Sequence, residues 1–266
     1  QNPPSPQKLH FDKTSAVECA LIFGLFVTAI DGVSGSAEAW RIALQLAAVA
    51  VIGVFFVKRQ KGRPAPLLPV DLLKRPMFAW SICSSICSFC AQMMAMVALP
   101  FLLQNIMHYD VLRIGILMAP WALGTMICAN IAGRLVEHIN GGLLGFFGML
   151  LFAAGLLTLY FMPVDTPEMG VLWRMLLCGS GFGFFQTPNN VIIMTSAPKH
   201  RSGGASGMQG TARVMGQTFG TTIVAVLFKL LDGASSARLA LLIAACIAVA
   251  ASIVSYQRRR VALNAL

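Results

Sequence analysis

Charged residues are scarce in this sequence. Asp, Glu, Lys and Arg make up only 11% of its 266 residues, against roughly 25% in a typical soluble domain. Hydrophobic residues make up 57%, in runs of about 20 residues that match the length needed to cross a bilayer. A soluble enzyme or binding module is excluded, because its helices would be apolar on one face only. We therefore expect an all-α polytopic membrane protein.

The apolar segments after residue 76 contain no Asp or Glu away from their ends. Glu18 and Asp31 lie near the two ends of the first apolar segment. Carboxylates within the membrane are frequent carriers of protons. A proton-coupled process would therefore have to draw its carboxylate from outside these segments.

Sets of metal ligands are also lacking. The seven cysteines are an odd number, without the spacing of a secreted disulfide framework. Cys83, Cys87 and Cys90 stand among apolar residues with no His or acid nearby, and a metal site needs such further ligands. We expect these thiols to pack as small apolar side chains, with no metal and no cofactor.

Apolar segments predict eight transmembrane helices, two before a basic linker and six after it. Their length and their apolar character on all sides favour membrane spans over buried helices of a soluble core. The predicted spans cover residues 15–34, 39–57, 77–103, 111–136, 143–162, 170–197, 203–231 and 237–256.

The remaining segments divide the chain. Residues 1–14 are polar and Pro-rich, which is typical of a linker, so we expect the N-terminal half of a longer protein upstream. Residues 15–57 hold two spans, residues 58–76 form a basic linker and an interfacial elbow, and residues 77–257 form a six-helix bundle. Residues 258–266 are expected to be a basic tail.

The net charge of +10 follows the predicted topology. Lys and Arg gather in alternate connections, and Asp and Glu in the others, so the positive-inside rule places both ends of the chain in the cytoplasm. A nucleic-acid surface is not expected, because the bases are split among short loops beside the bilayer. The basic connections hold Lys58, Arg59, Lys61, Arg63, Lys74, Arg75, Arg134, Lys199 and Arg201.

Polar side chains on the third span follow one helical face. Ser81, Ser85, Ser88 and Gln92 are spaced i, i+4, i+7 and i+11. Polar residues at membrane depth face the bundle interior or a watery cavity, and we expect Ser88 and Gln92 to line one. The serines have an alternative role, since their hydroxyls can bond to carbonyls of their own helix.

The sixth span gathers amides around a proline. Gly179, Gly183, Gln186 and Asn190 share a face, and Pro188 interrupts the helix beside them. Freed carbonyls next to amides are typical of a hydrated cavity. Hydrogen bonds between helices are the alternative; we favour the cavity, because polar residues cluster so tightly here.

The seventh span carries Arg213 on a stripe of small and polar residues, with Gly203-xxx-Gly207 and Gly216-xxx-Gly220 spacings that permit close helix approach. Arg213 lies roughly 15 Å from the preceding turn at helical rise. It is therefore deep in the membrane, although a long side chain can also reach back to the headgroups.

Aromatic and Met side chains near these positions would form the apolar wall of a cavity, where they can hold a flat or cationic molecule. Their alternative role is packing. The predicted lining is Ser88, Gln92, Met96, Trp121, Phe182, Gln186, Asn190 and Gln217.

Two stretches resemble the C-terminal half of the 14-helix drug:proton antiporters of the major facilitator superfamily, most closely the bacterial pumps for methyl viologen and quaternary ammonium biocides. They are LLPVDLLKRPMFAWSICSSICSFCAQMMAMVALPFLLQ and GFGFFQTPNNVIIMTSAPKHRSGGASGMQGTARVMGQTFGTTIV. The resemblance extends over essentially the whole chain, and residues 15–57 match the extra central helix pair of that group.

The resemblance implies roles for further residues. It places Gly133, Arg134 and Glu137 in a cytoplasmic gating loop, although Glu137-His138 replaces the usual Asp-Arg pair and weakens that assignment. It matches Pro188 to the family's sixth-span amide cluster and Arg213 to its Arg-containing glycine helix. Because Arg213 would repel a cationic substrate, we expect it to serve conformational coupling, together with Pro188, Gly210, Gly216 and Gly220.

The function implied by the resemblance is export of lipophilic cations across a bacterial inner membrane, driven by inward proton flow and alternating access of two bundles. The absent N-terminal half would supply the proton-carrying carboxylate. The alternatives are a major facilitator transporter for a metabolite or siderophore, or a membrane anchor subunit without transport. An enzyme is not expected, because no His, Cys or carboxylate constellation shares a face.

Overall fold

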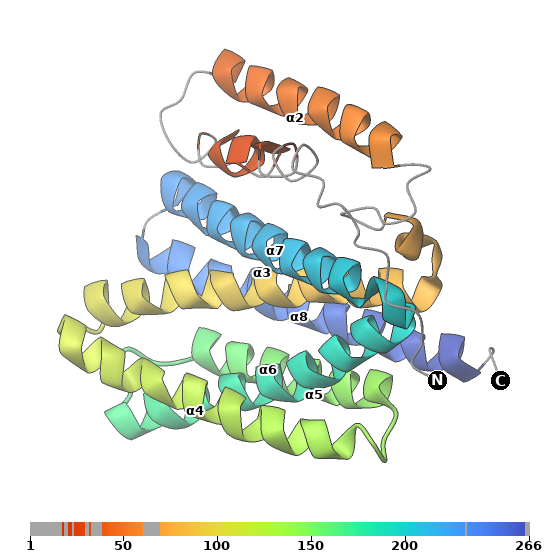
Figure 1. Cartoon of the computed structure of the whole chain (residues 1–266). Helices are drawn as coiled ribbons and strands as arrows, with labels where there is room; N and C mark the ends of the chain where they lie inside the picture. The colour runs from red at the N-terminus through yellow and green to blue at the C-terminus, as the bar shows by residue number, and fades with distance from the viewer. Residues whose placement is uncertain are drawn as a thin grey trace.

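The described residues fold into a series of helices (Figure 1). The computed structural model describes residues 18, 21–22, 24–29, 32, 39–60, 70–231 and 233–263. No β-strand occurs among these residues, and the predicted all-α class is confirmed. Most of the first predicted span and the N-terminal linker lie outside the described residues.

The described bundle consists of long helices that follow the predicted spans closely. Before it come α2 (Ala39–Gln60) and the short 3-10 helix η1 (Val70–Lys74), and η2 (Lys199–Arg201) joins α6 to α7. The bundle helices are α3 (Pro76–Asn105), α4 (Val111–Leu135), α5 (Gly141–Tyr160), α6 (Glu168–Ser196), α7 (Ser202–Leu230) and α8 (Gly233–Leu263).

Four described helices are long and apolar enough to cross a membrane: α3, α4, α5 and the Gly233–Arg258 part of α8. α6 and α7 are 29 residues each and carry the amides, glycines and Arg213 that lower their hydropathy. The main difference from the predicted spans is at α8. It continues to Leu263, through the arginines that the sequence assigned to a basic tail.

The bundle is built from two interleaved groups of three helices. α3 packs between α7 and α8, and α6 packs between α4 and α5, while α5 also contacts α8. Exchanging α3–α5 with α6–α8 maps these contacts onto one another. Two repeated groups of three helices are typical of transporters built from structural repeats.

Glycine permits the closest helix approaches. A Cβ at Gly179 of α6 would lie 2.0 Å from the carbonyl oxygen of Trp121 in α4. On α7, a Cβ at Gly216 would lie 2.5 Å from the carbonyl oxygen of Ile86 in α3. Because real side chains do not fit at such distances, any larger residue would push these helices apart. The predicted close approach through Gly216 is therefore present.

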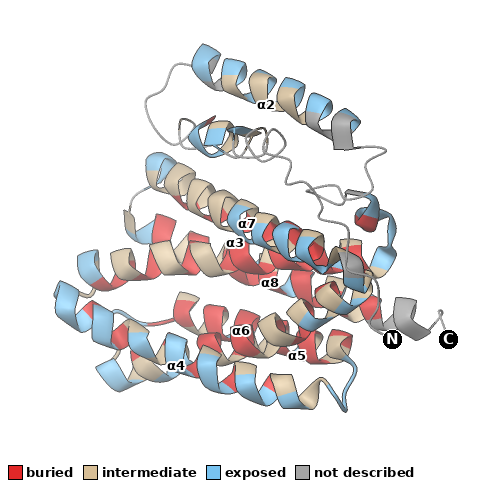
Figure 2. Ribbon diagram, viewed as in Figure 1, coloured by how far each residue is buried: buried red, intermediate tan, exposed pale blue. Residues whose placement is uncertain are grey.

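Burial is concentrated where α3, α5, α6 and α8 meet (Figure 2). Small residues line the buried face of α8, including Ala237, Ala244, Ala248 and Ala251, so that it lies close against α3 and α5. α4 and α7 present exposed faces instead.

Candidate functional site

A row of aromatic rings crosses the bundle from α4 to α7. Trp121 stacks edge-on against Phe152 with ring centroids 5.6 Å apart, and Phe152 against Phe182 at 5.8 Å. Phe182 meets Phe89 of α3 at 5.6 Å, and the Arg213 guanidinium of α7 lies 5.6 Å from the Phe89 ring centroid. The row therefore connects five helices and ends at a cation.

Trp121 and Phe182, predicted to line a cavity, are buried in this row, with exposed fractions of 4% and 2%. The Trp121 indole Nε1 is buried and has no hydrogen-bond partner among the described residues. Ser88 is also buried, and its hydroxyl donates to the Ser85 carbonyl at 2.9 Å. In this conformation these three residues pack the core behind the predicted lining.

Arg213 lies on the exposed face of α7. It is eleven residues beyond Ser202, about 16 Å along the helix, and it has no hydrogen bond or ion pair within the described part of the chain. Its neighbours one to three turns earlier are Gly203, Gly207 and Gly210, where a Cβ would meet no atom within 4 Å. No described residue therefore makes the predicted close contact at Gly203 or Gly207, and this face of α7 is uncovered by the described part of the chain.

Half-buried amides occupy three helices. Asn190 of α6 accepts a hydrogen bond from Gln209 of α7 at 2.5 Å, which joins these helices near their shared turn. Gln92 and Gln186 are half-buried and make no side-chain hydrogen bond within the described residues. Gln217 on α7 and Met96 on α3 are half-buried as well. These five are the members of the predicted cavity lining that have accessible surface, whereas Gln209 was not predicted.

A second arginine, which the sequence did not single out, is buried inside the bundle on α8. Arg258 of α8 is 1% exposed, and its guanidinium donates to Ser81 Oγ at 3.0 Å and to Asn189 Oδ1 at 2.5 Å. A second nitrogen donates to Ser255 Oγ at 2.5 Å. The Asn189 amide in turn donates to Ser85 Oγ at 2.7 Å.

This Arg258 cluster solvates a cation with neutral groups only. No carboxylate contacts Arg258 within the described residues, and its Nε is buried without a partner there. Burying a charge is costly unless several polar groups surround it. Because those groups come from α3, α6 and α8, the cluster holds these three helices together. Its member from α6, Asn189, directly follows Pro188.

An ion pair joins the elbow to the α6–α7 turn. Both oxygens of Asp71 in η1 accept hydrogen bonds from Arg201 in η2, one of them at 2.9 Å. The bound Arg201 guanidinium holds the pKa of the Asp71 carboxyl below its ordinary value and raises the pKa of Arg201. Nearby, Arg75 donates to the Ser196 carbonyl at 3.0 Å. The elbow is therefore fastened to the end of α6.

The predicted gating loop follows α4. Gly133 lies against α6, where a Cβ would be 3.6 Å from the Thr187 methyl group. Arg134 and Glu137 are exposed and form no ion pair within the described residues. No group of three or more His, Cys, Asp or Glu residues that could hold a metal occurs in the described part of the chain.

Comparison with known proteins decides the family. The family model described as Major Facilitator Superfamily matches residues 14–221. This chain belongs to the major facilitator superfamily. Members of this superfamily are multi-pass membrane transporters and not enzymes, so the membrane class expected from composition is confirmed.

Several relatives of this major facilitator chain are known. It is 48% identical over 248 residues to the uncharacterized transporter YebQ of Escherichia coli (strain K12), which covers 93% of this chain and 54% of the relative. It is 27% identical over 219 residues to the multidrug resistance protein Stp of Mycobacterium tuberculosis (strain ATCC 25618 / H37Rv), covering 80% and 40%. A tetracycline resistance determinant of Streptomyces rimosus is 30% identical over 205 residues, covering 75% and 57%. The chain thus spans about half the length of the curated relatives it matches.

Proposed function

We propose that this chain is the C-terminal half of a proton-driven efflux transporter that exports lipophilic cations, such as quaternary ammonium biocides and viologens, from a bacterial cytoplasm. Superfamily membership supports transport, and relatives named for multidrug resistance support drug-like substrates. The observation that carries the proposal is the face of α7 around Arg213, which no other described helix covers. It holds a deep cation beside half-buried amides and aromatic rings.

The proposed cavity lining is the half-buried set Gln92, Met96, Gln186, Asn190 and Gln217. Amides offer hydrogen bonds without a net charge that would repel a cation, and thioethers adapt to flat apolar surfaces. Ser88, Trp121 and Phe182 form the layer behind this wall. They would become part of the lining when the helices move during alternating access.

Arg213 has a different proposed role. A fixed positive charge repels a cationic substrate, so Arg213 serves coupling between the two halves. It pairs with an acidic or carbonyl group of the N-terminal half, which also holds the proton-carrying carboxylate. The Phe89 ring keeps the guanidinium in place when that partner withdraws.

Helix movement would be centred on the coupling residues. Pro188 removes one backbone hydrogen bond from α6, which allows bending next to Asn189. Gly216 and Gly220 let α7 slide along α3, because neither glycine has a side chain and the nearest atoms at both positions are backbone carbonyl oxygens of α3. Gly210 lies one and a half turns earlier on the open face.

The proposed orientation places the η1 and η2 ends of the bundle in the cytoplasm, together with both ends of this chain. Lys74, Arg75, Arg134, Lys199 and Arg201 all lie at that end, as the positive-inside rule requires. The membrane would be the bacterial inner membrane.

The test is transport by the intact protein in inverted membrane vesicles that are energised by a proton gradient. Vesicles should accumulate ethidium, methyl viologen and a quaternary ammonium compound, and collapsing the gradient should stop accumulation. Neutral sugars and an organic anion of similar size are the controls. Uptake of none of the cations, or uptake that persists without the gradient, would refute the proposal.

A further inference from the structure

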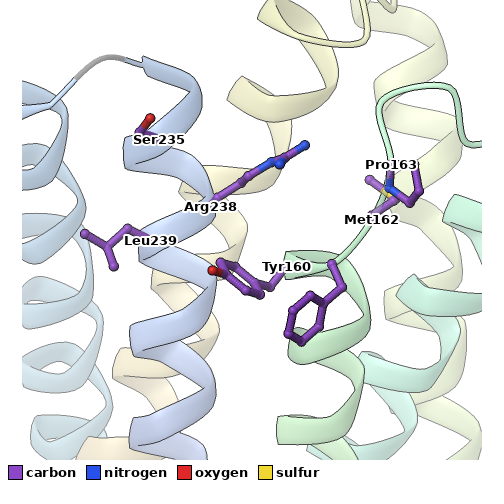
Figure 3. A pocket seen from close by; sticks show the side chains of 7 residues that line it. Tyr160, Met162, Pro163, Ser235, Arg238 and Leu239 are labelled. Atoms are coloured by element: carbon purple, nitrogen blue, oxygen red, sulfur yellow. The ribbon is translucent and has the colours of Figure 1, made fainter.

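A pocket with both polar and apolar walls opens between the end of α5 and the first turns of α8 (Figure 3). It lies at the end of the bundle opposite to η1 and η2, because α5 ends and α8 begins there. Its volume is about 430 Å³. Its lining residues are Tyr160, Phe161, Met162, Pro163, Ser235, Arg238 and Leu239.

Arg238 is the only cation among these lining residues. Its side chain extends from α8 towards the segment after α5 (Figure 3), and it has no hydrogen bond or ion pair within the described part of the chain. Other arginines at this end are engaged: Arg174 donates to the Thr158 carbonyl at 3.1 Å, and Arg113 lies 3.4 Å from Glu168. The guanidinium of Arg238 therefore has free donors for an external acceptor.

The depth of Arg238 suits the headgroup layer. It lies five residues after Gly233, about 7.5 Å into α8 at helical rise, and an arginine side chain can reach back from that depth to phosphate level. Tyr160 and Phe161 lie beside it, as aromatic residues do at membrane interfaces. The first turn of α8 adds backbone N–H groups and the positive end of the helix dipole.

The remaining walls are apolar. Phe161 is 73% exposed, Met162 is buried, and Pro163 follows it in the segment after α5. A small soluble anion would satisfy Arg238 but would leave these surfaces uncovered. An anion that carries an acyl chain would cover these apolar surfaces and also pair with Arg238.

We propose that this pocket binds the phosphodiester headgroup of an anionic phospholipid. Arg238 donates to the phosphate oxygens, the Tyr160 and Ser235 hydroxyls are available to the glycerol oxygens, and the upper part of an acyl chain lies against Phe161 and Pro163. The site is a fixed lipid position on the α5–α8 side of the bundle. It does not depend on which substrate the protein carries.

The test counts lipids that remain bound to the intact protein. The protein is purified in mild detergent with an equimolar mixture of phosphatidylglycerol and phosphatidylcholine and examined by native mass spectrometry. Wild type should retain phosphatidylglycerol in preference to phosphatidylcholine. Arg238→Gln should bind it about tenfold more weakly, as expected for loss of charge-assisted hydrogen bonds, whereas Arg113→Gln, with the same charge change at the same end, should match wild type.

A second variant and a second ligand test the same pocket. Phe161→Ala, an exposed position that should fold normally, is expected to weaken phosphatidylglycerol retention, and glycerol 3-phosphate alone should not protect the protein from thermal unfolding. Equal retention by Arg238→Gln and wild type would overturn the site. If glycerol 3-phosphate protects the protein from thermal unfolding as well as phosphatidylglycerol does, the ligand of the pocket is not a lipid. Neither readout requires transport, so failure here and failure of efflux are separate results.

Discussion

Arg258 donates a hydrogen bond to the side-chain oxygen of Asn189, 69 residues away in the sequence, inside the helix bundle. Both residues are buried, with exposed fractions of 1% and 2%. Asn189 follows Pro188, at the point where α6 lacks a backbone hydrogen bond. The Arg258 cluster therefore holds α6 to α3 and α8 at the position where α6 bends most easily.

Removing this guanidinium should weaken the bundle. Arg258→Gln leaves Ser81 and Asn189 buried with fewer partners, and we expect the free energy of unfolding of the intact protein in micelles to fall by about 2–4 kcal/mol. Arg134→Gln removes the same charge from an exposed position at the same end and should change it by about 0.5 kcal/mol or less. Equal effects of the two substitutions would show that the cluster contributes no special stability.

Glycine substitutions on α7 should separate packing from function. Gly216→Ala places a methyl group 2.5 Å from the Ile86 carbonyl oxygen, which is too close, so folding yield and thermal stability should drop. Gly207→Ala and Gly210→Ala enter open space and should leave stability unchanged. Fluorescence-detected size-exclusion chromatography after heating distinguishes the two groups. Equal loss of stability at Gly207 would contradict the uncovered face.

The Asp71–Arg201 pair predicts a pH dependence with a defined sign. Because the pKa of Asp71 is lowered in the folded protein, the pair contributes stability above the ordinary carboxyl pKa of about 4 and loses it as the pH falls below that value. The pair is partly exposed, so the effect should be small. Asp71→Asn should remove this acid-dependent part of the stability.

A charge reversal tests the same pair at neutral pH. Asp71→Arg and Arg201→Asp should each lower thermal stability, and the double variant should recover part of the loss. Additive losses in the double variant would show that the elbow and the α6–α7 turn are not coupled through these side chains.

Helix positions followed from the sequence because hydrophobic length is a local property. The spans predicted at 111–136 and 203–231 became α4 and α7 with nearly the same ends. The face of a helix that packs is a different matter, since it depends on partners far away in the chain. Gly179 shares the predicted polar face of α6, yet it lies against the α4 backbone.

Arg258 shows why part of the site was not predicted. Three consecutive arginines after an apolar span are typical of a cytoplasmic tail. A signal was present, however: small residues at Ala248, Ala251 and Ser255 of α8 are spaced for one face, and Arg258 is the next position on it. Its acceptors Ser81 and Asn189 come from other helices, so only the tertiary structure identifies them.

The most direct test of the proposed transport pathway is the rate of ethidium uptake into proteoliposomes that contain the intact protein and carry a proton gradient. Arg213→Ala should abolish gradient-driven uptake while expression and thermal stability stay at wild-type levels, because the side chain is exposed and its loss costs no hydrogen bond to any described residue. Arg113→Ala, an exposed arginine at the opposite end of the bundle, should transport normally. Normal uptake by Arg213→Ala would contradict the account.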